Sequence, residues 1–386
     1  MSSDQWNRLP LEDCMDAIID YRGKTPRKSS FGIPLITAKI VKGGRILEPT
    51  EFIPFEDYDE RMQRGIPESG DVVITTEGPL GEVGQLDNRK LSIGQRIITL
   101  RGKKGLLDNT YLKYLLMSHY VQTQLSARET GTTVSGIKQA ELRKIELLIP
   151  PLPTQIHIAE ILSALDDKIE LNRQTNATLE AIAQAIFKEW FVDYNYPGAT
   201  GEMVDSELGP IPKGWRVSSI TSELNIVYGR TLPTTKLTAK GFPIFGGNGL
   251  LGFYENYLYD EPQVIVACRG AASGKVNQSL PKSFVTNNSL VFEIQKTSTI
   301  TFPYLKFFCL NMDFRSFVSG SAQPQLTIDS LHQAKLLIPD SSIITTFSQV
   351  VSAIETIRIE NDTQSNLLST IRDELLPKFM TGNMNL

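Results

Sequence analysis

The stretch GTTVSGIKQAELRKIELLIP, residues 131–150, decides the architecture of this chain, because a related stretch, GSAQPQLTIDSLHQAKLLIP, stands at residues 320–339. The offset is 189 residues, from Pro150 to Pro339. The register continues without a gap, so that SALDDKIELN at residues 163–172 aligns with SAIETIRIEN at residues 352–361. A solenoid repeat has a period of about 20 to 50 residues. The longer period predicts two similar domains in tandem, which agrees with a chain of 386 residues.

Each half begins with a mixed segment that opens near a tryptophan, Trp6 or Trp215. Short β-branched runs such as DVVITT and QVIVAC, bounded by turn residues, predict strands, and the patterns at residues 109–125 and 301–318 predict short helices. We therefore expect an α+β domain of about 150 residues, present twice.

The stretch RGAASGKV, residues 269–276, resembles the phosphate-binding pattern G-x-x-x-x-G-K-[ST]. Arg269 stands at the first glycine position and Val276 at the hydroxyl position, so two chemical roles of the loop are missing. The corresponding stretch of the first half, EGPLGEVG at residues 77–84, has no lysine at all. We interpret both stretches as turns between strands.

Each half ends in a segment with the pattern of a long helix. Residues 154–191 contain no proline or glycine, and their apolar residues recur at spacings of three and four, which predicts a helix of about 37 residues and about 55 Å. The second half repeats the pattern, with Arg358 and Arg372 on the expected seam, where we expect Ile357 and Ile371 to serve instead. We predict that the two helices pack on each other rather than each on its own domain, through a seam that contains Leu162, Leu165, Ile169, Asn172, Leu179, Ile186, Val351, Ile354, Asn361, Leu368 and Leu375.

Composition and charge limit the function classes. Three separated cysteines and three separated histidines encode neither a disulfide framework nor a zinc cluster, so no metal site is expected. The chain lacks an apolar run of about 18 residues and its first residues are polar, so we expect a cytoplasmic protein with no membrane contact.

The net charge of −4 conceals local basic clusters. Residues 22–45 hold seven basic and no acidic residues, and residues 225–254 and 262–292 are also basic without a carboxylate. Basic segments next to flexible Gly and Asn loops suit contacts to phosphates and base edges. We predict a DNA-binding set of Arg22, Lys24, Lys39, Lys42, Arg45, Arg230, Lys236, Asn248, Arg269 and Lys275.

No catalytic constellation stands out. FGGNG at residues 245–249 fits a loose S-adenosylmethionine pattern, but the one Pro-Pro pair, Pro150 and Pro151, lacks the flanking residues that hold a flipped base. Because H-E-x-x-H and G-x-S-x-G motifs are also missing, we expect a recognition scaffold without an active site. Two alternatives stay open: an enzyme that binds a nucleotide or S-adenosylmethionine through the glycine loops, and a coiled-coil adaptor with no DNA role.

Four stretches resemble the specificity subunit of Type I restriction-modification systems: IELLIPPLPTQIHIAEILSALDDKIELNRQ at residues 145–174, LGPIPKGW at 208–215, FPIFGGNGLLGFY at 242–254 and LLPKFMTGNM at 375–384. The resemblance implies a target recognition domain at residues 1–150, a central helix at 151–194, a linker and second recognition domain at 195–340, and a C-terminal helix at 341–386.

This resemblance also implies a function. Each domain would read one half of a bipartite, asymmetric site on double-stranded DNA, and the helices would pair as an antiparallel coiled coil that sets the spacing and docks two methyltransferase subunits. Motor-nuclease subunits would join the complex. The partners would carry S-adenosylmethionine, ATP and Mg, and this chain would hold no cofactor.

Overall fold

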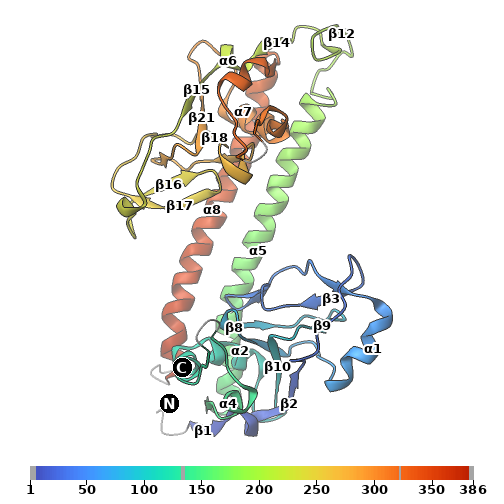
Figure 1. The fold of residues 1–386 in the computed structure, drawn as a ribbon, viewed down its shortest axis with the longest axis vertical. Coiled ribbons are helices and arrows are strands. Elements are labelled where there is room, and N and C mark those ends of the chain that lie inside the picture. Colours follow the sequence, from blue (N-terminus) through green and yellow to red (C-terminus); the bar gives the residue numbers. More distant parts are fainter. Residues whose placement is uncertain (1–5, 132–134, 321–322, 382–386) are drawn as a thin grey trace. The chain divides into compact units, whose positions relative to one another are not determined.

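The computed structural model describes residues 6–131, 135–320 and 323–381. It contains two compact units, Met1–Arg173 with Asp362–Leu386, and Gln174–Asn361 (Figure 1). Each unit holds one α+β domain together with a segment of each long helix. The compact units therefore divide the chain differently from the four consecutive segments expected from the sequence, because segments of both helices pack with each domain.

The first domain is built on an antiparallel sheet in the order β2-β10-β7-β8, formed by Met15–Asp20, Ile97–Gly102, Val72–Thr76 and Leu80–Gln85. The central strand β7 is buried along its whole length. Val72 and Ile74 face one apolar cluster and Val73 faces another, so both sides of the sheet are covered. A strand that is buried on both faces has few polar residues in its sequence, which explains the VVITT pattern.

The second domain repeats this sheet as β15-β21-β18-β19, formed by Leu224–Tyr228, Ser289–Ile294, Val264–Ala267 and Val276–Gln278. Its central strand β18 is likewise buried throughout. Val264 and Val266 face the larger apolar cluster of this domain, and Ile265 faces the smaller one. The duplication predicted from the sequence is thus also present in the strand order.

The smaller sheets repeat as well. The first domain has a three-stranded sheet in the order β6-β3-β9 (Phe52–Ile53, Ile33–Ile36, Ser92–Ile93), and the second has one in the order β17-β16-β20 (Gly249–Tyr254, Phe242–Gly246, Phe284–Val285). In both sheets the central strand pairs antiparallel with the first strand of this order and parallel with the third. Strand β1 (Asn7–Pro10) pairs with β11 (Glu146–Ile149), and β14 (Arg216–Ser219) pairs with β22 (Lys335–Ile338). Two further hairpins have no equivalent among the described strands of the other half: β4–β5 (Val41–Lys42, Arg45–Ile46) and β12–β13 (Met203–Val204, Ile211–Pro212).

Short helices cover each main sheet: α1 (Tyr58–Arg61), α2 (Asn109–Met117), α3 (His119–Ala127) and α4 (Gln139–Arg143) in the first domain, and α6 (Ile220–Glu223) and α7 (Phe302–Asn311) in the second. The buried Tyr111 of α2 donates its hydroxyl proton to the carbonyl of Leu148 in β11, at 3.0 Å. Tyr304 of α7 makes the equivalent bond to Leu337 in β22, at 2.6 Å. In each domain, a buried tyrosine therefore bonds the covering helix to the strand that leads into the long helix.

The two long helices are α5 (Leu152–Phe191) and α8 (Ser341–Met380), of 40 residues each, which confirms the predicted helices. Helix α5 begins just after Pro151. Helix α8 lacks that proline-rich start, and instead the Asp340 carboxylate accepts the backbone N–H of Ser342 at 2.8 Å. A carboxylate at this position satisfies one of the free amides of the first turn.

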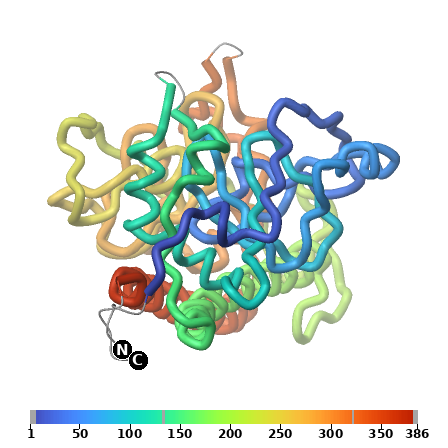
Figure 2. Tube along the Cα trace, turned by 90° about the horizontal axis from the view of Figure 1, so that it is seen from below, coloured from blue at the N-terminus to red at the C-terminus, as the bar shows by residue number. Residues whose placement is uncertain are grey.

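Side chains of α5 contact side chains of α8 within each unit. In the first unit, the buried Asn172 donates to the side chains of Gln364 and Ser365, at 2.9 and 3.2 Å. Figure 2 shows the start of α5, in green, and the end of α8, in red, on the same side of the first domain. In the second unit, the Asn361 side-chain amide donates to the side-chain amide oxygen of Asn176 at 2.9 Å. The predicted seam asparagines thus bond across the helices, and the coiled coil over the full helix length stays a prediction.

The expectation for the arginines on the seam was wrong. Ile357 and Ile371 are 45% and 37% exposed, whereas the side chains of Arg358 and Arg372 are 25% and 18% exposed and lie toward α5. Arg358 pairs with Glu180, and Arg372 pairs with Asp166 at 2.8 Å. The arginines keep their seam positions because α5 supplies a carboxylate opposite each of them.

These carboxylates belong to two similar ionic clusters. In the first unit, Asp166 of α5 accepts bonds from Lys113 of α2 at 3.1 Å and from the Tyr114 hydroxyl at 2.7 Å, besides Arg372. In the second unit, Glu355 of α8, aligned with Asp166 in the repeat, accepts from Lys306 of α7 at 2.5 Å.

Burial would raise the pKa of Asp166, but Lys113, Arg372 and Tyr114 together hold this pKa below its ordinary value. A depressed carboxylate pKa contributes stability above the unfolded-state pKa of about 4, and this stability is lost as the pH falls through the folded-state value.

We expect Asp166→Asn to destabilise the chain by about 3 to 5 kcal/mol, because it removes the counter-charge shared by the buried Lys113 and the partly buried Arg372. Urea unfolding at neutral pH measures this loss. The exposed neighbour Asp167 provides the control, since Asp167→Asn is expected to change stability by no more than about 0.5 kcal/mol. The stability of wild type should fall toward that of Asp166→Asn as the pH is lowered below about 4. Equal stability of wild type and Asp166→Asn at neutral pH would contradict the assignment.

Candidate nucleic-acid interface

The RGAASGKV stretch is a turn between the antiparallel strands β18 and β19, as interpreted from the sequence. Two of the backbone amides at its glycine–lysine end are already bonded to nearby carbonyls. The N–H of Gly274 donates to Ala267 at 2.8 Å, and the N–H of Lys275 donates to Ala272 at 2.9 Å. A phosphate loop needs such amides free to point at the ligand, so this turn is not arranged as one.

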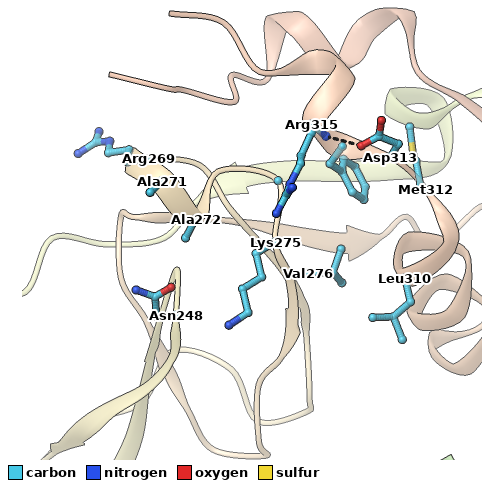
Figure 3. A pocket seen from close by; sticks show the side chains of 13 residues that line it. Asn248, Arg269, Ala271, Ala272, Lys275, Val276, Leu310, Met312, Asp313 and Arg315 are labelled. Carbon is cyan, nitrogen blue, oxygen red and sulfur yellow. Dashed lines mark hydrogen bonds between the residues drawn. The ribbon is translucent and has the colours of Figure 1, made fainter. Parts of the chain in front are cut away.

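The turn forms one wall of a groove of about 710 Å³ in the second domain (Figure 3). Three predicted DNA-binding residues line it: Asn248 from the β16–β17 hairpin, and Arg269 and Lys275 from the turn, with the Arg269 side chain pointing away from the other two in Figure 3. All three are exposed. The groove thus combines amide and cationic groups in one concave surface, the mixture that contacts phosphates and base edges.

A fourth polar residue of the groove, Arg315, was missed in the sequence analysis. It lies in the short helix η7 (Phe314–Phe317), whose first residue is buried against Phe292 with ring centroids 5.6 Å apart. The Asp313 carboxylate accepts the backbone N–H of Arg315 at 3.1 Å. Among the described ion pairs, none involves the guanidinium of Arg315. No sequence motif marks this residue, which lies inside the helical pattern at residues 301–318, whereas the helix ends at Asn311.

The other two predicted residues of the second domain do not line the groove. Arg230 is exposed next to β20, where its backbone N–H donates to Val285 at 2.9 Å. Lys236 ends the short helix η5 (Thr234–Lys236) and is also exposed. Their role in DNA binding stays a prediction.

The predicted residues of the first domain are spread over several places. Arg22 is bonded to Asp20 at 2.7 Å and to the carbonyl of Ile137 at 2.9 Å. Lys24 lines a depression of about 400 Å³ that also contains Asp57 and Glu60. The remaining three are Lys39, which is 81% exposed and 3.9 Å from Glu51, and Lys42 and Arg45, which lie in the β4–β5 hairpin.

Arg45 shows that this hairpin reaches α5. Its guanidinium lies 3.2 Å from the Glu170 carboxylate of that helix. Within the first unit, a basic residue of the hairpin therefore lies against an acidic residue of the helix. It also means that Arg45 shares its charge with a carboxylate of this chain.

The three cysteine thiols are buried. Burial raises the pKa of Cys14 to about 11 and also raises the pKa of Cys268 and of Cys309, so these thiols are not poised as nucleophiles. FGGNG forms the tight connection between β16 and β17. In the described part of the chain, no group of three or more His, Cys, Asp or Glu residues could hold a metal ion. The helices described there also lack the length and apolar character that crossing a membrane requires.

The repeated fold and the basic groove agree with what comparisons with known proteins show. The family model for the Type I restriction modification DNA specificity domain matches residues 4–181 and again residues 212–367. The two matches together cover most of the chain. The chain therefore belongs to the Type I restriction modification DNA specificity family, which confirms the resemblance seen in the sequence.

Relatives of similar length support this membership. The MjaIX specificity subunit of Methanocaldococcus jannaschii is 27% identical over 98% of this chain and 93% of its own length. The HindI specificity subunit of Haemophilus influenzae is 23% identical over 78% of this chain and 82% of its own. The crystal structure of a Type I restriction-modification S subunit from M. genitalium superimposes with a TM-score of 0.59 at 17% identity, covering 97% of this chain and 96% of that one, and so shows the same fold.

The position of Arg315 depends on Gly274, which gives a stability prediction. Gly274 has a φ of +88°, and a Cβ added there would lie 3.1 Å from the Arg315 backbone nitrogen. We expect Gly274→Ala to lower the free energy of unfolding by roughly 2 to 4 kcal/mol, because the left-handed conformation and the close contact both disfavour a side chain there. The matched control is Gly270→Ala, with a φ of +72° and open space, where we expect about 1 kcal/mol. Denaturant unfolding of both variants tests this, and equal losses would show that the contact is unimportant.

Proposed function

We propose that this chain is the non-catalytic DNA-recognition subunit of a Type I restriction-modification complex and reads a bipartite, asymmetric site. The observation that carries the proposal is the duplicated strand order of two domains within a chain of the DNA specificity family, each domain presenting exposed basic side chains. Two related domains give two related but separate contacts with DNA. Because their loops differ, the two halves of the site differ in sequence.

The division of roles follows from how each part is built. The doubly covered sheets form rigid supports, and the loops at their ends carry the polar groups that read DNA. Phosphate contacts position the domain, and base-edge contacts from residues such as Asn248 specify the sequence. The amides of Gly274 and Lys275 in the β18–β19 turn are engaged, which supports a recognition role over nucleotide binding.

We propose that the long helices set the spacing between half-sites and dock two methyltransferase subunits. Forty residues correspond to about 60 Å of helix at about 1.5 Å per residue. Both helices expose aliphatic residues that no described domain covers: Leu171 and Leu367 in the first unit, Ile182 and Ile359 in the second. Apolar residues on an outer helix face are suited to bind a partner protein.

The chemistry of the complex is then assigned to its partners. Methyltransferase subunits bring S-adenosylmethionine and methylate adenine, and motor-nuclease subunits bring ATP and Mg. This chain needs no cofactor of its own for recognition. Its work takes place in the cytoplasm, where the DNA of the cell is accessible.

The first test is the methylation pattern in cells that carry this chain and its methyltransferase partner. We expect sequencing of methylated adenines to reveal one bipartite site. Exchanging residues 195–340 for the corresponding segment of a relative should change one half of the site and leave the other half unchanged. A pattern without sequence preference, or a change in both halves, would contradict the proposal.

The second test concerns the partners. We expect Leu171→Asp and Leu367→Asp together to weaken assembly with the methyltransferase subunit by at least about tenfold, since two charges would enter an apolar contact. Phe55→Asp serves as the control, because Phe55 is similarly exposed but lies in the short helix η3 (Phe55–Asp57). Titration of the full chain with the partner measures both. Undiminished assembly of the leucine variant would exclude this face.

A further inference from the structure

The β7–β8 turn of the first domain and the β18–β19 turn of the second can be compared residue by residue. Val73 pairs with Gly84 in the first domain, and Ile265 pairs with Asn277 in the second. Counting back along β8 and β19 from these pairs, Gly81 corresponds to Gly274, and both have a left-handed φ, of +85° and +88°. The two turns therefore have the same backbone register, so the side chains at equivalent positions can be compared directly.

The charge at three equivalent positions differs between the domains. Glu77 corresponds to Arg269, and each makes an isolated bridge to the later loop, at Gly136 and Gln325 respectively. Glu82 corresponds to Lys275, which directly follows Gly274. The residue that packs on the left-handed glycine is Gln122 in the first domain and Arg315 in the second. Two carboxylates and an amide are thus replaced by three cations.

In the first domain this surface is occupied by the chain itself. The β4–β5 hairpin lies on β8, where the backbone N–H of Gly43 donates to the Glu82 carboxylate at 2.7 Å. A Cβ at Gly84 would lie 2.7 Å from Ile46, so glycine is what lets the hairpin approach. Glu77 is paired with Arg96 at 3.0 Å, and the Gln122 amide donates to the carbonyl of Gly81 at 2.9 Å.

In the second domain the corresponding connection is too short to cover β19. Strands β16 and β17 are joined directly through Gly247 and Asn248. The side-chain amide of Asn277, which stands where the first domain has Gly84, donates to the Gly247 carbonyl at 3.0 Å and holds this hairpin. The groove lined by Arg269, Lys275 and Arg315 lies beside it, and Figure 3 shows these side chains.

We infer that this open groove grips the sugar–phosphate backbone of the DNA half-site read by the second domain, and that the first domain holds its half-site without an equivalent grip among its described residues. The inference rests on the proposed function. Among the charged side chains of the groove, three are cationic and only Asp313 is anionic, and the Asp313 carboxylate already accepts the backbone N–H of Arg315. Arginine offers a planar fork for phosphate oxygens and lysine a point charge, so the groove attracts a polyanion.

The test is a transplant of the first domain's side chains: Arg269→Glu, Lys275→Glu and Arg315→Gln in the assembled complex. Each lost phosphate contact lowers the slope of log affinity against log salt by about 0.9. We expect the triple variant to lose roughly two to three units of slope and to bind cognate DNA at least about a hundredfold more weakly at low salt. Lys296 provides the matched control, because it is exposed and follows β21 at Ile294, the opposite end of that strand from the groove.

Neutral methylphosphonates placed one at a time along the site give the second readout. Methylphosphonates in one half-site should weaken DNA binding by the wild-type complex. The same substitutions should have little effect on DNA binding by the triple variant, because that variant has already lost the contacts to these phosphates. An unchanged salt slope in the triple variant, or equal methylphosphonate effects in wild type and variant, would overturn the inference while leaving sequence-specific binding intact. Loss of sequence preference in the wild-type complex would instead count against the proposed function.

Discussion

The carboxylates on the helix seams are the constraint on which the rest of the structure depends. Asp166 accepts bonds from the helix of its own domain, through Lys113 and Tyr114, and from the other long helix, through Arg372. Glu355 accepts from Lys306 in the second unit. Each domain is thus attached to the helices at a position where an isolated charge would be costly, since breaking a buried pair costs about 3 to 5 kcal/mol. This attachment fixes how each domain lies on the helix segments of its own unit.

Rigid support also explains how the two domains differ. Both central sheets are closed by apolar clusters on each face, and the polar differences compared above lie in the β7–β8 and β18–β19 turns and on the adjoining strands β8 and β19. The pair Gly84 and Asn277 illustrates this: one side chain decides whether a hairpin lies on the neighbouring strand or is held beside it. Such exchanges change the surface offered to DNA while the core stays the same.

Local patterns predicted the main elements, and long-range contacts account for what was missed. The spacing of apolar residues predicted both long helices, and the turn chemistry of RGAASGKV predicted a strand connection, because both signals lie within a few neighbouring residues. The prediction wrongly replaced the seam arginines by neighbouring isoleucines, because the partners of these arginines are distant in sequence. Asp166 and Arg372, for example, are 206 residues apart. Arg315 was missed for the same reason: only the folded chain brings η7 beside the β18–β19 turn. The spread of the basic residues in the first domain, with Arg22 tied to Asp20, likewise depends on tertiary contacts.

The distribution of charge on the two helix seams has one more consequence. Asp166 and Glu180 are two heptads apart on α5, and Arg358 and Arg372 are two heptads apart on α8. An antiparallel match of α5 with α8 places each acid opposite an arginine. A match of α5 with another α5 would place acid opposite acid, and a match of two α8 helices would place arginine opposite arginine. The charges on the seam thus favour pairing of α5 with α8 over pairing of two like helices.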